Sequence, residues 1–335
     1  MKYIVCQQPG QLLLKEKEWP SPKANEALVA IKRIGVCGTD LHAYMGNQAY
    51  FSYPRILGHE LAAEVLEVGD NPQGIGKGDR VIPMPYISCG ACIACRNGKT
   101  NCCVSMKVMG VHIDGGMQEQ IAIPTDLLIK SNNLSFNEMA IVEPLAIGAH
   151  AIRRAQLRKD EFVVVVGCGP IGIGIIKLAQ IAGAKVISLD ANKARLDYAL
   201  NVIRADYAFN AIEKPIDEIE RVTNGDMATV VFDATGHKTA LETGFEYMAH
   251  GGRYVLVGLS KGELTFIHPK IHAKESTIMC SRNATLEDFE NVIDILPRFP
   301  TDTFITQEIA FDNVVDKFKS LIMPENHVIK AVIKI

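Results

Sequence analysis

The sequence has no block of like charge, no uninterrupted apolar run long enough to cross a bilayer, and only one tryptophan. A formal net charge of -3 provides no basic surface for a phosphate backbone, so nucleic acid is not an expected partner. The longest apolar stretch, 162–176, is interrupted by glycine and proline and is shorter than the roughly 20 residues of a membrane helix. The N-terminal apolar run is also too short for a secretory signal. We therefore expect a soluble, cytoplasmic protein without a membrane partner.

The length of 335 residues favours two domains, each with its own core. The first 150 residues are rich in short β-branched runs that end at glycine or proline, which predicts an all-β domain with long loops. From Glu161 onward, continuous apolar strands alternate with helical patterns, as in a parallel sheet covered on both faces. The last 50 residues or so carry two helical patterns and end in the strand-like segment 328–335. The predicted fold class is α/β.

A glycine-rich turn follows the first strand of the alternating region. Gly167, Gly169 and Gly172 form the pattern GxGxxG between an apolar strand and a helical segment. Without side chains, the backbone of such a turn can approach a pyrophosphate, and the N-terminus of the helix offers it free N–H groups. We predict a dinucleotide site here, which also includes Pro170 and Ile171.

The next strand ends in Asp190, 18 residues after the last glycine of the motif. A carboxylate at this place accepts both ribose hydroxyls of an adenosine and repels a 2′-phosphate, which favours NAD over NADP. The alternative is that Asp190 only caps the next helix, a task for which Asp is well suited. Arg195 lies on that helix and is a further candidate for cofactor binding, but the pattern leaves open whether it faces the cofactor.

Five of the nine cysteines fall within one stretch of fifteen residues. In a reducing compartment, such a cluster indicates a metal rather than disulfides. Four of them follow the spacing CxxCxxCx7C: Cys89, Cys92, Cys95 and Cys103. This spacing lets four thiolates bind one zinc at about 2.3 Å, and a closed shell of four sulfurs indicates a structural ion. Cys102 is the spare thiol, and an iron–sulfur cluster is an alternative whose usual spacing differs.

Three separated segments contain other residues of the types that bind metals. They are Cys37 in GVCGTDLH, His59 and Glu60 in LGHE, and Glu143 in VEPLAIGAH. Taken singly, each has an ordinary explanation, because a small buried cysteine usually belongs to a core and a GHE tripeptide to a turn. The residues alone leave that choice open.

The order and spacing of these motifs resemble those of zinc-containing medium-chain alcohol and polyol dehydrogenases over essentially the whole chain. The motifs are GVCGTDLH, LGHE, the four-cysteine segment, GDRV and VVGCGPIG. The resemblance implies a GroES-like β-barrel catalytic domain in 1–148 and a doubly wound Rossmann domain that binds NAD in 149–281. It also implies that the segment 282–335 returns to the catalytic domain.

The resemblance further implies two zinc ions per chain. The catalytic ion would be held by Cys37, His59 and Glu143, with Glu60 alternating between direct ligation and a place behind the ligands. Glu143 stands where the alcohol dehydrogenases themselves have a cysteine, and this replacement resembles the sorbitol dehydrogenase branch, whose substrates are polyols. By direct ligation, such a zinc would make a substrate hydroxyl acidic, and hydride would then pass to NAD.

The family uses a hydroxyl and a histidine to relay the proton from this centre to solvent. Thr39 and His42 occupy the matching positions, and Glu60 belongs with them to the expected catalytic residues. The alternative is a turn hydroxyl for Thr39 and an ordinary surface ring for His42.

Shorter phrases resemble the hexonate 5-dehydrogenases that oxidise L-galactonate or L-gulonate, among them GNQAYFSYPR, EPLAIGAHAIRR and SRNATLEDF. We therefore expect oxidation of a secondary hydroxyl of a sugar acid or polyol, at C5 of such a hexonate. Arg282 resembles a substrate-side arginine of polyol dehydrogenases, and a guanidinium can bind a carboxylate or a diol with two hydrogen bonds. Asn283, His112 and Lys107 are weaker candidates. The resemblance also suggests a homodimer or homotetramer.

Three other interpretations remain at this stage. One is a dehydrogenase of sorbitol or threonine type, which acts on a polyol or an amino alcohol. Another is a zinc-free quinone reductase, but such a protein has no use for Cys37, His59 and Glu143 together. The third, from another class, is an interaction protein that binds a partner through a zinc ribbon and senses NAD; the acidic balance argues against nucleic acid as that partner.

Overall fold

The computed structural model describes residues 1–48 and 51–335, which divide into two compact units. The first unit consists of Met1–Pro144, Thr285–Leu296 and Thr301–Ile335, and the second of Leu145–Ala284 and Pro297–Pro300. The boundaries between the units, after Pro144 and after Ala284, lie a few residues from the domain limits at 148 and 281 expected from the sequence. Those expected limits stay a prediction. Among the described residues, no helix combines the length and the apolarity that a membrane span requires.

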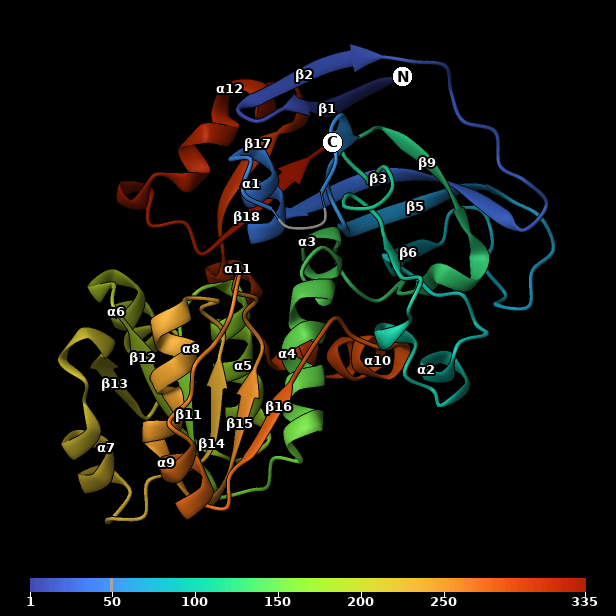
Figure 1. The fold of residues 1–335 in the computed structure, drawn as a ribbon. Coiled ribbons are helices and arrows are strands. Elements are labelled where there is room, and N and C mark those ends of the chain that lie inside the picture. The colour runs from blue at the N-terminus through green and yellow to red at the C-terminus, as the bar shows by residue number, and fades with distance from the viewer. Residues whose placement is uncertain (49–50) are drawn as a thin grey trace. The chain divides into compact units, whose positions relative to one another are not determined.

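The first unit is built on a seven-stranded sheet with the main order β10-β6-β5-β3-β18-β17, and β9 pairs with β3 (Figure 1). The strands are β3 (Glu26–Val36), β5 (Glu60–Val68), β6 (Arg80–Pro83), β9 (Gln120–Pro124), β10 (Leu128–Lys130), β17 (Ile305–Ala310) and β18 (Lys330–Lys334). Buried and half-buried positions alternate along most of β3, because successive side chains of a strand point to opposite faces. β18 pairs antiparallel with β3, so the last strand of the chain becomes an inner strand of the sheet.

A three-stranded sheet and several short elements complete this unit. The small sheet has the order β2-β1-β4 and consists of β1 (Lys2–Gln8), β2 (Gln11–Glu16) and β4 (Arg55–Ile56). A two-stranded ladder pairs β7 (Tyr86–Ile87) with β8 (Lys107–Val108). The helices are α1 (Gly38–Tyr44), α2 (Ile93–Arg96), α3 (Phe136–Met139), α10 (Leu286–Ile295), α11 (Thr301–Phe304) and α12 (Val314–Lys317). Apolar side chains from both sheets and from α1 and α12 form one core.

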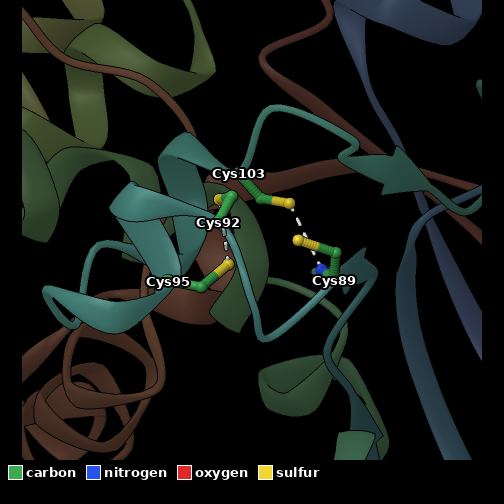
Figure 2. Close-up of side chains that lie close together, drawn as sticks. All are labelled: Cys89, Cys92, Cys95 and Cys103. Carbon is green, nitrogen blue, oxygen red and sulfur yellow. Dashed lines mark hydrogen bonds between the residues drawn. The ribbon is translucent and has the colours of Figure 1, made fainter.

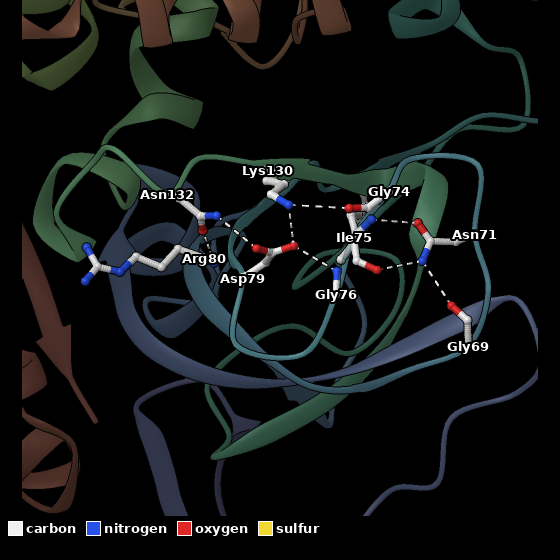
Figure 3. A network of polar contacts seen from close by, with 9 residues as sticks. All are labelled: Gly69, Asn71, Gly74, Ile75, Gly76, Asp79, Arg80, Lys130 and Asn132. Atoms are coloured by element: carbon white, nitrogen blue, oxygen red, sulfur yellow. Dashed lines mark hydrogen bonds and ion pairs between the residues drawn. The ribbon is translucent and has the colours of Figure 1, made fainter.

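Polar contacts hold the loop between β5 and β6 (Figure 3). Asp79 accepts hydrogen bonds from the backbone of Gly76 at 2.8 Å and from the side chain of Asn132 at 2.9 Å. Its carboxylate also pairs with Lys130 at 2.7 Å. Asn71 closes the same loop on itself through its side chain. Because Lys130 ends β10, these contacts join the loop to the strand that pairs with β6.

The second unit contains a six-stranded parallel sheet in the order β13-β12-β11-β14-β15-β16. Its strands are β11 (Phe162–Val166), β12 (Lys185–Asp190), β13 (Tyr207–Asn210), β14 (Ala228–Asp233), β15 (Met248–Leu256) and β16 (Thr277–Cys280). Its helices are α5 (Pro170–Ile181), α6 (Lys193–Asn201), α7 (Ile216–Val222), α8 (Lys238–Thr243) and α9 (His268–Ala273), preceded by α4 (Val142–Ala155). This strand order is that of the Rossmann fold, as the sequence predicts.

The local sequence explains the first strand of this unit, β11, and the helix that follows it, α5. The last four residues of β11 are buried, as expected of a parallel strand covered on both faces. α5 packs on β11 and β12, and α6 packs on β12 and β13. α5 begins with Gly169 as its N-cap and Pro170 in its first turn, where a missing N–H costs nothing.

Candidate metal centres and dinucleotide site

The four cysteines of the predicted structural site converge (Figure 2). The sulfur atoms of Cys89, Cys92, Cys95 and Cys103 all lie within 4.8 Å of one another. A tetrahedral zinc at about 2.3 Å from each sulfur separates the sulfurs by about 3.8 Å, so the four thiols fit this ion. Cys102 is exposed and lies outside the group.

Backbone N–H groups donate hydrogen bonds to sulfur atoms of this group. The sulfur of Cys103 accepts from the N–H of Cys89 at 3.2 Å and from that of Ser105 at 3.4 Å. The N–H groups of Cys95 and Val104 lower the pKa of Cys92 to about 6. Burial, together with Cys92, raises the pKa of Cys95 to about 11. Because the thiolate is the form that binds metal, the backbone contacts favour the ligating state at Cys92 but not at Cys95.

A second cluster combines Cys37, His59 and Glu60, whose ligand atoms also lie within 4.8 Å of one another. Cys37 follows β3 and is the N-cap of α1. His59 and Glu60 stand at the start of β5, where Glu60 lies opposite Gly35 of β3. A Cβ atom on Gly35 would lie 2.0 Å from Oε2 of Glu60, so the missing side chain makes room for the carboxylate.

The buried polar atoms of this cluster fit a cation. Among the described residues, Nδ1 of His59 and Oε1 of Glu60 are buried without a hydrogen-bond partner. The Nδ1 atom lies 3.8 Å from a carboxylate oxygen of Asp40. Burial by itself lowers the pKa of His59, but Asp40 and Cys37 together raise it well above its ordinary value. Negative charge therefore surrounds the imidazole, as a cationic site requires.

Asp40 joins the segment of Cys37 to the segment of His59 through hydrogen bonds to its carboxylate. It is fully buried, and its carboxylate accepts from the backbone of Cys37 at 3.0 Å and of Gly58 at 3.2 Å. Asp40 is not among the residues predicted from the sequence. Its place three residues after the N-cap cysteine, where an acid often closes a capping box, was the available signal.

Glu143 stands beside this cluster, in the first turn of α4, and its side chain is 5% exposed. It does not belong to the group whose atoms lie within 4.8 Å of one another, although its charge acts on His59. Its Oε1 accepts a hydrogen bond from the hydroxyl of Tyr86, which is also not among the residues predicted from the sequence. Burial raises the pKa of Glu143.

The two residues of the predicted proton relay lie on α1. Thr39 is half-buried and His42 is exposed, three residues further along the helix. Residues at this spacing share a helix face. Nδ1 of His42 lies 2.8 Å from the side-chain oxygen of Asn47.

The predicted substrate residues are distributed over both units. In the first unit, His112 is exposed, its Nδ1 accepts from the backbone of Val108 at 3.1 Å, and Lys107 is exposed on β8. In the second unit, Arg282 and Asn283 follow β16. Their role in substrate binding stays a prediction.

The glycine motif forms a tight turn between β11 and α5. Gly167 has a φ of +95°, which favours glycine. A Cβ atom on Gly172 would lie 1.7 Å from the carbonyl oxygen of Gly167, so this position requires close packing of helix and strand. Above Gly169, by contrast, the nearest atom to such a Cβ is a guanidinium nitrogen of Arg195 at 4.0 Å. The space beside Gly169 therefore suits a phosphate group.

Asp190 lies at this turn and does not cap the next helix. Its carboxylate accepts from the backbone of Cys168 at 2.7 Å and of Asn192 at 2.8 Å. The N-cap of α6 is Asn192, whose side chain accepts from two N–H groups of the helix. The capping alternative for Asp190 is therefore wrong. The guanidinium of Arg195 lies near Gly169, and its part in binding the cofactor stays a prediction.

Comparison with known proteins agrees with this geometry. The alcohol dehydrogenase GroES-like domain matches residues 23–133, and the zinc-binding dehydrogenase family matches residues 170–298. The chain is 39% identical to L-galactonate-5-dehydrogenase of Escherichia coli (strain K12), with 99% of this chain and 98% of that protein covered. The chain is a zinc-binding medium-chain dehydrogenase.

Other relatives of this dehydrogenase point the same way. It is 33% identical to a sorbitol dehydrogenase of Halalkalibacterium halodurans over 92% of each chain. A structure described as a short chain alcohol dehydrogenase from E. coli CFT073 with NADH has a TM-score of 0.92 and 31% identity. That match covers 100% of this chain and 99% of the other. The predicted family, fold class and enzyme class are confirmed, which argues against the interaction protein and the zinc-free reductase.

Proposed function

We propose that this dehydrogenase oxidises a secondary hydroxyl of a sugar acid, at C5 of L-galactonate or L-gulonate, with NAD as the hydride acceptor. The observation that carries the proposal is the cluster of Cys37, His59 and Glu60 beside the carboxylate of Glu143. The 39% identity to an L-galactonate-5-dehydrogenase over nearly the whole chain supports the substrate class. The carboxylates of Asp190 and Glu143 support NAD and a polyol-type metal shell, respectively.

In this proposal, Cys37, His59 and Glu143 hold the catalytic zinc. Glu60, whose Oε1 is buried without a hydrogen-bond partner, alternates between binding the ion directly and standing behind the ligands. When bound, zinc supplies the Lewis acidity that acidifies a substrate hydroxyl, and NAD supplies the acceptor for the hydride. Asp40 keeps the segments of Cys37 and His59 in register through their backbone N–H groups. The glycine turn and Asp190 hold the dinucleotide at the pyrophosphate and the ribose.

The proton of the substrate hydroxyl has to leave a buried centre. Thr39 is half-buried and offers a hydroxyl that can both accept and donate. His42 is exposed and can release the proton to solvent, with its ring oriented by the contact to Asn47. We propose this pair as the proton route.

A substrate panel tests the proposal. It contains L-galactonate, L-gulonate, sorbitol, L-threonine and simple primary alcohols, each with NAD and with NADP, and follows the absorbance of the reduced cofactor. We expect the hexonates with NAD to have the highest kcat/KM. A preference for sorbitol or threonine would favour the alternative function, a dehydrogenase of sorbitol or threonine type. The 33% identity to a sorbitol dehydrogenase supports that alternative. A preference for primary alcohols would exclude both.

Metal analysis tests the centre separately from the substrate. We expect two zinc ions per chain, one of which is lost in Glu143→Ala together with activity. The four-cysteine site serves as the internal control, because its ligands do not include Glu143. Retention of two ions and of activity in Glu143→Ala would refute the proposed ligand set. The assembly as a homodimer or homotetramer stays a prediction.

A further inference from the structure

Tyr86 is a buried phenol that the mechanism above does not use. Its side chain is 5% exposed, and its ring packs edge-on against Phe289, with the ring centroids 6.2 Å apart. The hydroxyl donates a hydrogen bond to Oε1 of Glu143. Through this hydrogen bond, Tyr86 contacts the carboxylate that stands beside Cys37, His59 and Glu60.

Tyr86 lies close in the chain to the cysteine site and contacts Glu143, beside the other candidate metal cluster of the first unit. It begins β7, three residues before Cys89, and pairs with Val108 of β8. The β7-β8 ladder closes the base of the segment that carries all four cysteines of the structural site. One side chain at the base of the cysteine segment thus contacts the carboxylate expected to bind the catalytic ion.

A hydrogen bond to one carboxylate oxygen affects how the carboxylate binds a metal. Oε1 of Glu143 accepts from the phenol, whereas no such contact occupies Oε2, so the hydrogen bond favours Oε2 as the oxygen that binds an ion. Groups that hydrogen-bond to metal ligands orient them, and losing such a contact typically reduces metal affinity by about 10- to 100-fold. Because Tyr86 is itself held by Phe289 and by the ladder, it can fix the orientation of Glu143.

We propose that Tyr86 is a positioning residue that presents a single oxygen of Glu143 to the catalytic metal. The proposal rests on the proposed function in that it takes Glu143 as a ligand. It predicts that removing only the hydroxyl lets Glu143 turn and bind through both oxygens or withdraw. Either change alters the coordination of the catalytic ion and leaves the four-sulfur site unchanged.

The test compares Tyr86→Phe with Tyr254→Phe in protein loaded with Co²⁺. Tyr254 is the matched control, because it is also buried and its hydroxyl donates to the carbonyl of Leu241 at 2.9 Å, in the second unit. In Tyr86→Phe, we expect a changed visible absorption of the catalytic Co²⁺ and an affinity of that centre for Zn²⁺ lower by about 10- to 100-fold. The absorption of the four-sulfur centre should persist in both variants.

A double-mutant comparison shows whether Tyr86 acts through Glu143. Because Glu143→Ala is expected to lose its catalytic ion, Zn²⁺ is titrated back into this variant and into the double variant. Tyr86→Phe should not lower the remaining affinity further, because the carboxylate that it positions is missing. A Tyr86→Phe spectrum and affinity equal to those of the wild type would overturn the positioning role, as would full additivity of the two variants. Retention of both metals in Glu143→Ala would refute the proposed ligand set and, with it, the role of Tyr86. Loss of the catalytic ion in Glu143→Ala together with an unchanged Tyr86→Phe protein would refute the role of Tyr86 alone.

Discussion

Lys330 donates from Nζ to a carboxylate oxygen of Glu60 across the strand that lies between them. The side chains are 1% and 0% exposed, and β3 separates β18 from β5 in the sheet. The ammonium also donates to the carbonyl of Val36 at 3.1 Å. The buried carboxylate of Glu60, next to Cys37 and His59, is therefore matched by a cation from the other end of the chain.

Replacing Lys330 by Met should destabilise the protein strongly. Removing one partner of a buried ion pair leaves the other charge unpaired, which costs about 3–5 kcal/mol. Urea denaturation of metal-free protein measures the effect. The control is Lys193→Met, because Lys193 pairs with Asp197 on the surface and its side chain is 85% exposed. We expect that control to lose no more than about 0.5 kcal/mol, and equal losses in the two variants would contradict the prediction.

Gly35→Ala should disturb Glu60 directly. The added Cβ would lie 2.0 Å from the carboxylate and 2.9 Å from the backbone oxygen of Ala140, so either the carboxylate or the strand has to move. Overpacking of this kind costs about 1–3 kcal/mol. We expect a lower melting temperature and weaker binding of the catalytic zinc. Gly69→Ala is the control, since its nearest neighbour lies at 3.9 Å; an unchanged Gly35→Ala protein would argue against the close approach.

Two glycines of the dinucleotide turn should respond differently to alanine. Gly172→Ala should lower the melting temperature, because its Cβ would collide with the carbonyl of Gly167. Gly169→Ala should leave the melting temperature unchanged and weaken NADH binding by about tenfold or more, because its Cβ enters the space proposed for the pyrophosphate. Fluorescence titration with NADH and thermal unfolding measure the two effects. Unchanged NADH affinity in Gly169→Ala would place the pyrophosphate elsewhere.

The Asp79 network should contribute stability that depends on pH. Hydrogen bonds from Asn132, Lys130 and Gly76 lower the pKa of Asp79 to about 2. Because the pKa in the unfolded chain is higher, at about 3.9, the contribution is fully present above that pH and disappears as the pH falls toward 2. The difference in stability between the wild type and Asp79→Asn should therefore be constant from about pH 5 to 7 and shrink below about pH 4. A difference that stays constant down to about pH 3 would contradict the assignment.

The features that the sequence alone predicted are local ones. The GxGxxG turn and the CxxCxxCx7C segment each lie within a short stretch, so their spacing alone limits the geometry. The continuous apolar strand β11 predicts a buried parallel strand for the same reason. For Cys37, His59 and Glu143, spacing was not enough, and the resemblance to a family was needed to connect them.

The partners of those residues became visible only in the folded chain. Lys330 is 270 positions from Glu60, and Tyr86 is 57 positions from Glu143. Nothing in the residues around Lys330 distinguishes it from a surface lysine, because its burial follows from the place of β18 beside β3. Sheet order and strand register bring such side chains together, and these are set by the packing of the whole chain rather than by distance along it.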